Sequence, residues 1–142
     1  MIMQFVALYA TLLLPQAAAN PAGFLDWPKG APPGGLSEKD AFPNHTLSIS
    51  HRDKDGLVEV HEKFADVIVV QTGEATLVVG GKVIEPATTT EPGEIRGKSI
   101  EGGVKRVVSP GDVIHIAAGT PHQFFIAHGG QITYVLVKVA TP

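Results

Sequence analysis

The sequence contains no cysteine, so neither disulfide bridges nor thiolate metal ligands can contribute to its structure or chemistry. Charged residues make up only 18% of the 142 residues, and the formal net charge is −3. No stripe of Lys and Arg with interleaved aromatic residues is present, which argues against a nucleic-acid partner. Segments with the 3.6-residue apolar period of an amphipathic helix are also missing. The chain is therefore expected to be a single domain without long amphipathic helices. Its stability must come from the hydrophobic core.

The longest apolar run, Phe5 to Leu14, has ten residues, which is too short to span a bilayer. Pro15 ends it, and the small residues 17–19 (Ala-Ala-Ala) follow as a cleavage pattern. Residues 1–19 are therefore predicted to be a signal peptide that is removed on export. The mature protein is expected to be periplasmic or secreted, with no membrane attachment after cleavage.

Residues 20–43 are rich in proline, glycine and alanine and have no helical or strand period, so we expect an extended N-terminal arm. Short runs rich in Val, Ile and Thr, separated by glycine-rich breaks, fill the rest of the chain. Many short strands of this kind are typical of a β-sandwich or barrel. The domain is predicted to be all-β and to cover residues 44–142.

Residues 85–103 are the least regular part of this domain, and we expect a long loop that could cover a barrel mouth, with room for a short strand near Ile95 or Ile100. The charged residues Glu91, Glu94, Arg96 and Lys98 in it are most simply solvated. If the loop forms a lid, Arg96 could contact an anionic substrate.

Two short motifs carry the residues with metal-binding chemistry. The first is Glu59-Val60-His61, then four residues, Asp66, six residues and Gly73; the second begins at Gly111 and ends at Gly119-Thr120-Pro121-His122. Glu59 and His61, two apart, face the same side of a strand. A chain reversal at residues 62–65 would let Asp66 begin the antiparallel neighbour, and His122 comes from a separate hairpin. Two imidazoles and two carboxylates could thus meet at one metal site.

At these residues the sequence resembles the cupin superfamily, in particular its small single-domain members. The family's first motif is His-x-His, four residues, Glu, six residues, Gly; the second is Gly, five residues, Pro-x-Gly, two residues, His. Both spacings match, while Glu59 replaces a His, Asp66 replaces a Glu and Ala117 replaces a Pro. The resemblance implies a double-stranded β-helix (jelly-roll) barrel whose interior binds a divalent metal. By this resemblance, His61, Asp66 and His122 are expected to be metal ligands.

The role of Glu59 has two interpretations. As a fourth ligand it would leave the ion neutralised and therefore a poorer Lewis acid. Displaced from the ion, it could act as a catalytic general base beside a two-His, one-carboxylate triad. The donor set is compatible with Mn²⁺, Fe²⁺ or Zn²⁺.

Three further residues are candidates for substrate binding. Phe124 shares the His122 face of its strand, and Tyr134 is expected opposite it, which would give a mostly apolar wall with one hydroxyl. His51 would point into the barrel if residues 52–56 close a simple hairpin. The leading hypothesis is a metalloenzyme, an oxygenase, isomerase or lyase, acting on a small organic molecule. The alternatives are a non-catalytic ligand- or metal-binding barrel and a structural barrel without metal.

The family commonly forms homodimers through strands or exchanged arms, and the arm offers Phe24 and Trp27 for such a contact. A homodimer is therefore expected.

Overall fold

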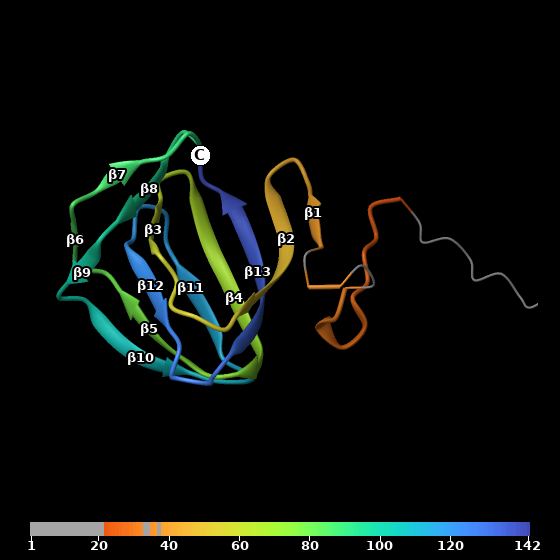
Figure 1. Ribbon diagram of the computed structural model, residues 1–142. Helices are drawn as coiled ribbons and strands as arrows, with labels where there is room; N and C mark the ends of the chain where they lie inside the picture. Colours follow the sequence, from red (N-terminus) through yellow and green to blue (C-terminus); the bar gives the residue numbers. More distant parts are fainter. Residues whose placement is uncertain (1–21, 33–34, 37) are drawn as a thin grey trace, which may run out of the picture.

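The computed structural model describes residues 22–32, 35–36 and 38–142, so the predicted signal peptide lies outside the described residues. Within these ranges the chain forms thirteen β-strands and one turn of 3₁₀ helix (Figure 1). No helix there has the length and apolar character needed to cross a membrane. The elements are η1 (Pro28–Gly30), β1 (Lys39–Ala41), β2 (His45–Arg52), β3 (Val58–His61), β4 (Phe64–Gly73), β5 (Ala75–Val79), β6 (Lys82–Ile84), β7 (Ala87–Thr88), β8 (Glu94–Gly97), β9 (Ser99–Glu101), β10 (Val104–Val108), β11 (Val113–Ile116), β12 (His122–Phe125) and β13 (Ile132–Ala140).

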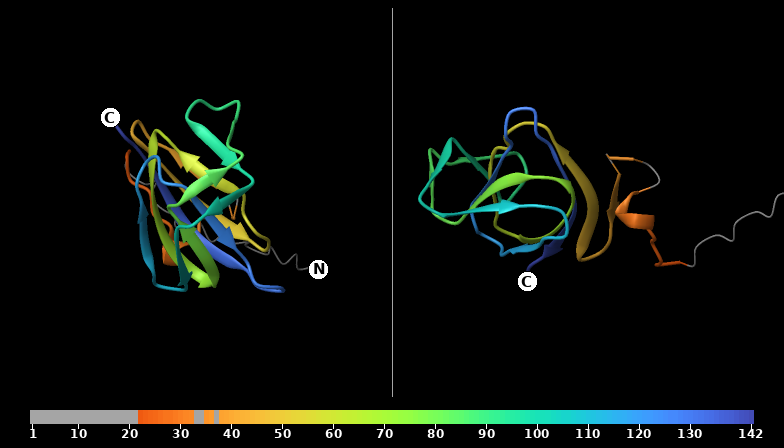
Figure 2. Two further views of the ribbon diagram at one scale, coloured as in Figure 1. Left: turned by 90° about the vertical axis from the view of Figure 1, so that its left-hand side faces the viewer. Right: turned by 90° about the horizontal axis from the view of Figure 1, so that it is seen from below.

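The strands form two antiparallel sheets that face each other. The first has the order β1-β2-β13-β4-β11 and the second the order β10-β5-β12-β3-β8-β7, while β6 and β9 pair separately. The chain crosses between the two sheets at each step from β2 to β5 and again at each step from β10 to β13. Seen along its length, the ribbon closes into a ring (Figure 2). The predicted all-β double-stranded β-helix is confirmed.

The core follows from strand alternation, because every second residue of a strand faces the barrel interior. Ile68 and Val70 of β4 pack there with Leu77 of β5, and all three are almost completely buried. Phe124 and Tyr134 belong to the same core cluster and also line the cavity described below. The core thus provides a fixed floor for that cavity.

Gly73, the last residue of the first motif, has a structural reason for being glycine. Its φ is +74°, in the left-handed region that side chains rarely adopt, and a Cβ atom here would collide with the carbonyl oxygen of Gln131. The close approach lets the end of β4 lie against the segment that enters β13. The motif glycine therefore serves the fold and does not line the cavity.

Two segments expected to be irregular contribute strands. Strand β1, within the predicted arm, pairs with β2 at the edge of the first sheet, and the arm also contacts β4, where Gln71 Nε2 donates to the carbonyl oxygen of Gly30 at 2.7 Å. The predicted loop of residues 85–103 contains β7, β8 and β9, and β8 pairs with β3 along all four residues of β3. Part of the expected loop is therefore barrel wall, next to the strand that carries Glu59 and His61.

Candidate metal centre

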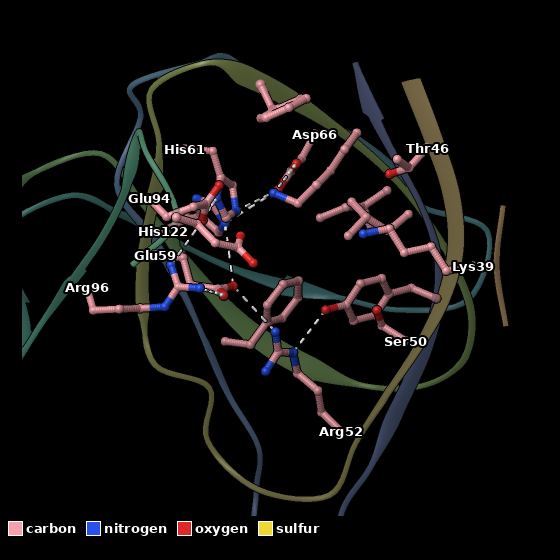
Figure 3. Close-up of a pocket in the computed structure, with 17 residues that line it drawn as sticks. Lys39, Thr46, Ser50, Arg52, Glu59, His61, Asp66, Glu94, Arg96 and His122 are labelled. Carbon is pink, nitrogen blue, oxygen red and sulfur yellow. Dashed lines mark hydrogen bonds and ion pairs between the residues drawn. The ribbon is translucent and has the colours of Figure 1, made fainter. Parts of the chain in front are cut away.

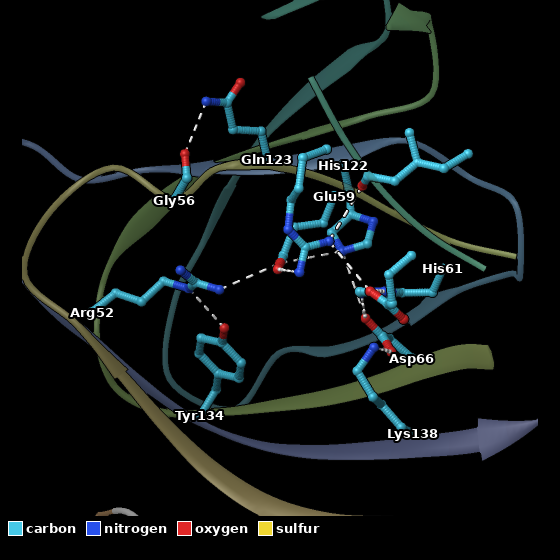
Figure 4. A network of polar contacts seen from close by, with 12 residues as sticks. Arg52, Gly56, Glu59, His61, Asp66, His122, Gln123, Tyr134 and Lys138 are labelled. Atoms are coloured by element: carbon cyan, nitrogen blue, oxygen red, sulfur yellow. Dashed lines mark hydrogen bonds and ion pairs between the residues drawn. The ribbon is translucent and has the colours of Figure 1, made fainter. Parts of the chain in front are cut away.

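The two motif histidines meet in the barrel interior, with their ring planes tilted by 58° to each other. His61 ends β3 and His122 begins β12; the backbone N–H of Gly119, in the turn before β12, donates to the carbonyl oxygen of His61 at 2.8 Å. Both side chains are buried, and their ring centroids are 5.1 Å apart. The second motif is thereby attached directly to the first, and each ring points its Nε2 toward the same point (Figure 4).

The other ring nitrogen of each histidine has an oxygen partner. His61 Nδ1 lies 2.6 Å from Glu94 Oε2, and His122 Nδ1 lies 3.1 Å from the carbonyl oxygen of Thr120. Burial is the largest single influence and raises the pKa of Glu94, but the hydrogen bond and charge of His61, together with Lys138 and Arg96, outweigh it and hold the pKa below its ordinary value. Because both partner oxygens accept, both Nδ1 atoms donate, which leaves each Nε2 of a neutral ring as an acceptor.

Asp66 faces these two nitrogens from the opposite sheet. Its Oδ2 lies 3.4 Å from His61 Nε2 and 3.6 Å from His122 Nε2, beyond the usual hydrogen-bond range of about 2.7–3.2 Å. The expectation that Asp66 would lie on the antiparallel neighbour of β3 is wrong, because β4 belongs to the first sheet and β3 to the second. The chain reversal after His61 crosses the barrel, so Asp66 closes the site from the other side.

This buried arrangement fits a divalent cation. With neutral rings, Asp66 Oδ2 and the two Nε2 atoms are three acceptors facing one another, an unfavourable arrangement unless a cation lies between them. Burial lowers the pKa of His122, although the Thr120 carbonyl and the nearby carboxylates oppose this, so the ring stays neutral at pH 7. Ligand atoms about 2.1 Å from a tetrahedral ion are roughly 3.4 Å apart, which is close to the two distances to Asp66.

Asp66 has a second charged partner. Lys138 of β13 places its Nζ 3.4 Å from Asp66 Oδ1, an ion pair that is too long for a good hydrogen bond. Asp66 Oδ1 and Lys138 Nζ are both buried, and neither has another hydrogen-bond partner. Lys138 offsets the charge of Asp66 from the side away from the histidines and leaves Oδ2 facing them.

Glu59 completes the cluster from β3, in register with His122 of β12. Its Oε2 lies 3.9 Å from His122 Nε2, and the side chains of Glu59, His61 and His122 offer ligand atoms that all lie within 4.8 Å of one another. Two arginines hold its carboxylate: Arg52 Nη2 is 3.4 Å from Oε2 and Arg96 Nη2 is 3.3 Å from Oε1. Glu59 is therefore within reach of an ion but is paired with two guanidinium groups.

A cavity of about 300 Å³ opens beside this cluster (Figure 3). The rings of Phe124 and Tyr134 stack in its wall with centroids 5.1 Å apart and planes 15° apart. Arg52 Nε donates to the Tyr134 hydroxyl at 2.9 Å, and the guanidinium lies 5.6 Å from the centre of the Phe124 ring. Burial raises the pKa of Tyr134, so its hydroxyl stays protonated at neutral pH. The structure thus places Phe124 and Tyr134 in the cavity wall.

The expected inward orientation of His51 is wrong. It assumed a hairpin between β2 and β3, but these strands lie in different sheets. In β2 it is Ser50 and Arg52 that line the cavity, so the intervening His51 faces outward, where it is exposed and its Nδ1 lies 2.8 Å from Thr133 Oγ1. His51 has no place among the cavity-lining residues.

Sequence reasoning missed three side chains that complete the site and gave the fourth, Arg96, a role only if its loop formed a lid. Glu94 and Arg96, interpreted as parts of a solvated loop, are two apart on β8 and both face the cavity. Arg52 was assigned to a turn but ends β2, and Lys138 follows Tyr134 at an even spacing on β13. Strand alternation could have found Lys138 and Arg52, whereas the pairing of β8 with β3 left no signal in the sequence.

Comparison with known proteins supports the fold alone. No protein-family model matches the chain, and no curated protein matches its sequence. Among solved structures, the chain is similar to a conserved Klebsiella pneumoniae protein with a double-stranded β-helix domain, at 16% identity, a TM-score of 0.50 and 70% coverage of each chain. The chain has the cupin fold.

Two other structures show a similar degree of likeness to this cupin barrel. The polyketide cyclase RemF of Streptomyces resistomycificus aligns at 20% identity and a TM-score of 0.50, over 72% of this chain and 58% of the cyclase. The Thermus thermophilus protein TT1209 aligns at 16% identity and a TM-score of 0.51, over 72% of this chain and 79% of that protein. At these identities the shared barrel says nothing about a shared activity.

Proposed function

We propose that this cupin is an exported metalloenzyme that acts on a small organic molecule. The observation that carries the proposal is the buried convergence of His61 Nε2, His122 Nε2 and Asp66 Oδ2 at the side of a 300 Å³ cavity. These three atoms would hold one divalent ion, Mn²⁺, Fe²⁺ or Zn²⁺, since all three ions accept imidazole and carboxylate ligands. Export is proposed on the apolar run and cleavage pattern of residues 1–19.

When bound, such an ion would act as a Lewis acid on a substrate oxygen. The protein's own groups provide the rest of the chemistry. Phe124 and Tyr134, 3% and 2% exposed, form a buried aromatic wall that excludes water. The half-buried Phe64 and Leu136 offer an apolar surface against which the body of the molecule can pack. Glu59, exposed by only 21% and directed at the same space, can accept a proton from a bound molecule as a general base. An isomerase, lyase or oxygenase reaction is compatible with this arrangement.

The alternative is a non-catalytic barrel in which Glu59 is a fourth ligand and the coordination sphere is closed. The enzyme and the binding barrel differ in whether the ion keeps a coordination position for water or substrate. Co²⁺ substitutes for tetrahedral Zn²⁺ and is paramagnetic, so Co²⁺-loaded protein in ¹⁷O-enriched water should show broadened electron paramagnetic resonance lines, because one exchangeable water occupies the fourth position. A spectrum that ¹⁷O water does not change would contradict the enzyme proposal and favour the closed binding barrel.

We also propose that the protein is a homodimer that pairs through the outer face of the first sheet. In β13, Tyr134, Leu136 and Lys138 line the cavity, so Val135 and Val137 face outward. The strand registers align two rows across this face: Val135, Val69 and Val113, and next to it Leu47, Val137, Val67 and His115. Ile49, which extends the first row on β2, is only 6% exposed and is already covered within the chain.

Neither row contains an Asp, Glu, Lys or Arg. An uncharged apolar sheet face can meet its own copy without placing like charges together, and an apolar face of this kind on a barrel exterior is typical of an interaction surface. Of these side chains Val113 is 71% exposed. A second copy of the chain, related by a twofold axis, is the occupant that fits.

The change Val137→Lys tests this surface, because it places a charge at the centre of both copies of the interface. Sedimentation equilibrium should show a dimer for the wild type and a dissociation constant raised at least about 100-fold in the variant, as expected for desolvation of an unpaired charge. Val104→Lys, on the exposed strand β10 of the other sheet, should remain dimeric. A monomeric wild type, or a variant that dimerises unchanged, would contradict the proposal.

A further inference from the structure

The carboxylate of Glu59 lies between two arginines that come from different sheets. Arg52, at the end of β2, approaches Oε2 at 3.4 Å, and Arg96, on β8, approaches Oε1 at 3.3 Å. Tight charge-assisted hydrogen bonds of this type are about 2.7–2.9 Å long. All three side chains line the cavity and are partly exposed to it, Arg52 by 27% and Arg96 by 32% (Figure 3). Glu59 is therefore a loosely held occupant of a two-arginine site.

Each arginine is also fixed by groups other than Glu59. Arg52 donates through Nε to the Tyr134 hydroxyl at 2.9 Å, beside the Phe124 ring (Figure 4). Arg96 donates through Nη1 to Glu94 Oε2 and to the carbonyl oxygen of Ile95, both at 3.2 Å. Both guanidinium groups would thus keep their positions if Glu59 moved away, which makes them preorganised donors for another anion.

The charges around the cavity also favour an anion once the site is complete. Its lining has four acidic side chains and four cationic ones. A divalent ion at the histidines, as in the proposed function, would leave an excess of two positive charges in a partly buried space. A substrate that carries negative charge would reduce this excess. The eight charged side chains are Glu59, Asp66, Glu91 and Glu94, with Lys39, Arg52, Arg96 and Lys138.

We propose that Arg52 and Arg96 recognise a carboxylate group of the substrate, and that Glu59 occupies their site until the substrate displaces it. The geometry of two guanidinium groups 3.3 and 3.4 Å from the two oxygens of one carboxylate is the basis for this assignment. Phe64 and Leu136, which are only half-buried, also line the cavity and give the rest of the molecule an apolar surface, so the substrate class is a small carboxylate with an aromatic or apolar body. Displacement would also free Glu59 to act on the substrate. This proposal rests on the proposed function, because the substrate carboxylate would bind in the same cavity.

The experiment uses metal-free full-length protein and benzoate as the probe, with uncharged benzamide as the matched control, measured by isothermal titration calorimetry. Glu59→Gln should bind benzoate more tightly than the wild type, by about tenfold or more, because the internal competitor loses its charge. Arg52→Gln and Arg96→Gln, each made in the Glu59→Gln background, should lower the affinity by a similar factor. Arg106→Gln in the same background, on the exposed strand β10, should not change it.

Benzoate affinity that stays the same or falls in Glu59→Gln would overturn the proposal, as would equal binding of benzamide. Circular dichroism melting of each variant separates loss of binding from loss of the fold. Because no metal is present, the result is independent of the ion. If benzoate binds but no metal does, the metalloenzyme proposal is wrong and the two-arginine site is supported. If metal binds but benzoate does not, the two-arginine site is wrong and the metalloenzyme proposal is unaffected.

Discussion

Replacement of His61 or His122 by alanine is expected to lower the affinity of the protein for divalent metal by more than about 100-fold, beyond the loss typical of outer-sphere partners. Each ring contributes one Nε2 to a buried group whose third member is Asp66 Oδ2, at 3.4 and 3.6 Å. Removing one ring leaves two protein ligands, too few to hold Zn²⁺ or Mn²⁺ firmly. Competition with a chromogenic chelator measures the affinity, and elemental analysis of the purified protein measures the stoichiometry.

The matched control is His128→Ala. His128 lies between β12 and β13, is exposed, and belongs neither to the cavity lining nor to the proposed dimer face. It removes the same ring without touching the cavity, so its metal affinity should equal that of the wild type. If all three variants retain metal equally, the ion binds elsewhere and the account of the site is wrong. Near-ultraviolet circular dichroism checks that the buried substitutions leave the barrel folded.

Replacement of Glu94 by alanine should lower metal affinity by about 10- to 100-fold, the range found when an outer partner of a metal-binding histidine is removed. Glu94 Oε2 lies 2.6 Å from His61 Nδ1 and so fixes both the orientation of the ring and the nitrogen that carries its proton. Without it, the ring can turn or present a protonated Nε2 to the site. Glu94→Gln keeps the shape and an acceptor oxygen, so its loss should be smaller. The same chelator competition measures both.

Glu91→Ala is the control for charge alone. Glu91 also lines the cavity and is exposed, but no contact joins its side-chain carboxylate to either histidine. If Glu91→Ala and Glu94→Ala lose the same affinity, the effect is a general loss of negative charge, and the positioning role of Glu94 is refuted. A loss confined to Glu94→Ala supports its contact with His61.

The sequence predicted the part of the site that depends on local spacing. Glu59 and His61 are two apart on one strand, so both face inward whichever strand is the neighbour. His122 follows a glycine turn that the second motif encodes directly. Phe124 and Tyr134 were correctly predicted to line the cavity for the same reason, since alternation along β12 and β13 fixes the side of the sheet that each faces. These inferences needed no knowledge of which strands pair.

The errors concern strand pairing, which alternation cannot show. His51 was placed inside on the assumption that β2 and β3 form a hairpin, and Asp66 was placed beside β3, whereas in both cases the chain crosses to the other sheet. Glu94 was missed, and Arg96 was considered only as part of a lid, because the four-residue strand β8 has a weak apolar pattern and is stabilised by its contact with β3. Short strands in a barrel depend on distant partners, so their identity emerges only in the folded chain.

The central claim is that His61, His122 and Asp66 hold one divalent ion, and anomalous X-ray diffraction from crystals grown with equimolar Mn²⁺ tests it most directly. The account predicts a single anomalous peak within bonding distance of His61 Nε2, His122 Nε2 and Asp66 Oδ2, absent from crystals of the His122→Ala variant. A fully ordered cavity with no anomalous peak, or a peak that lies away from these three atoms, would contradict the claim.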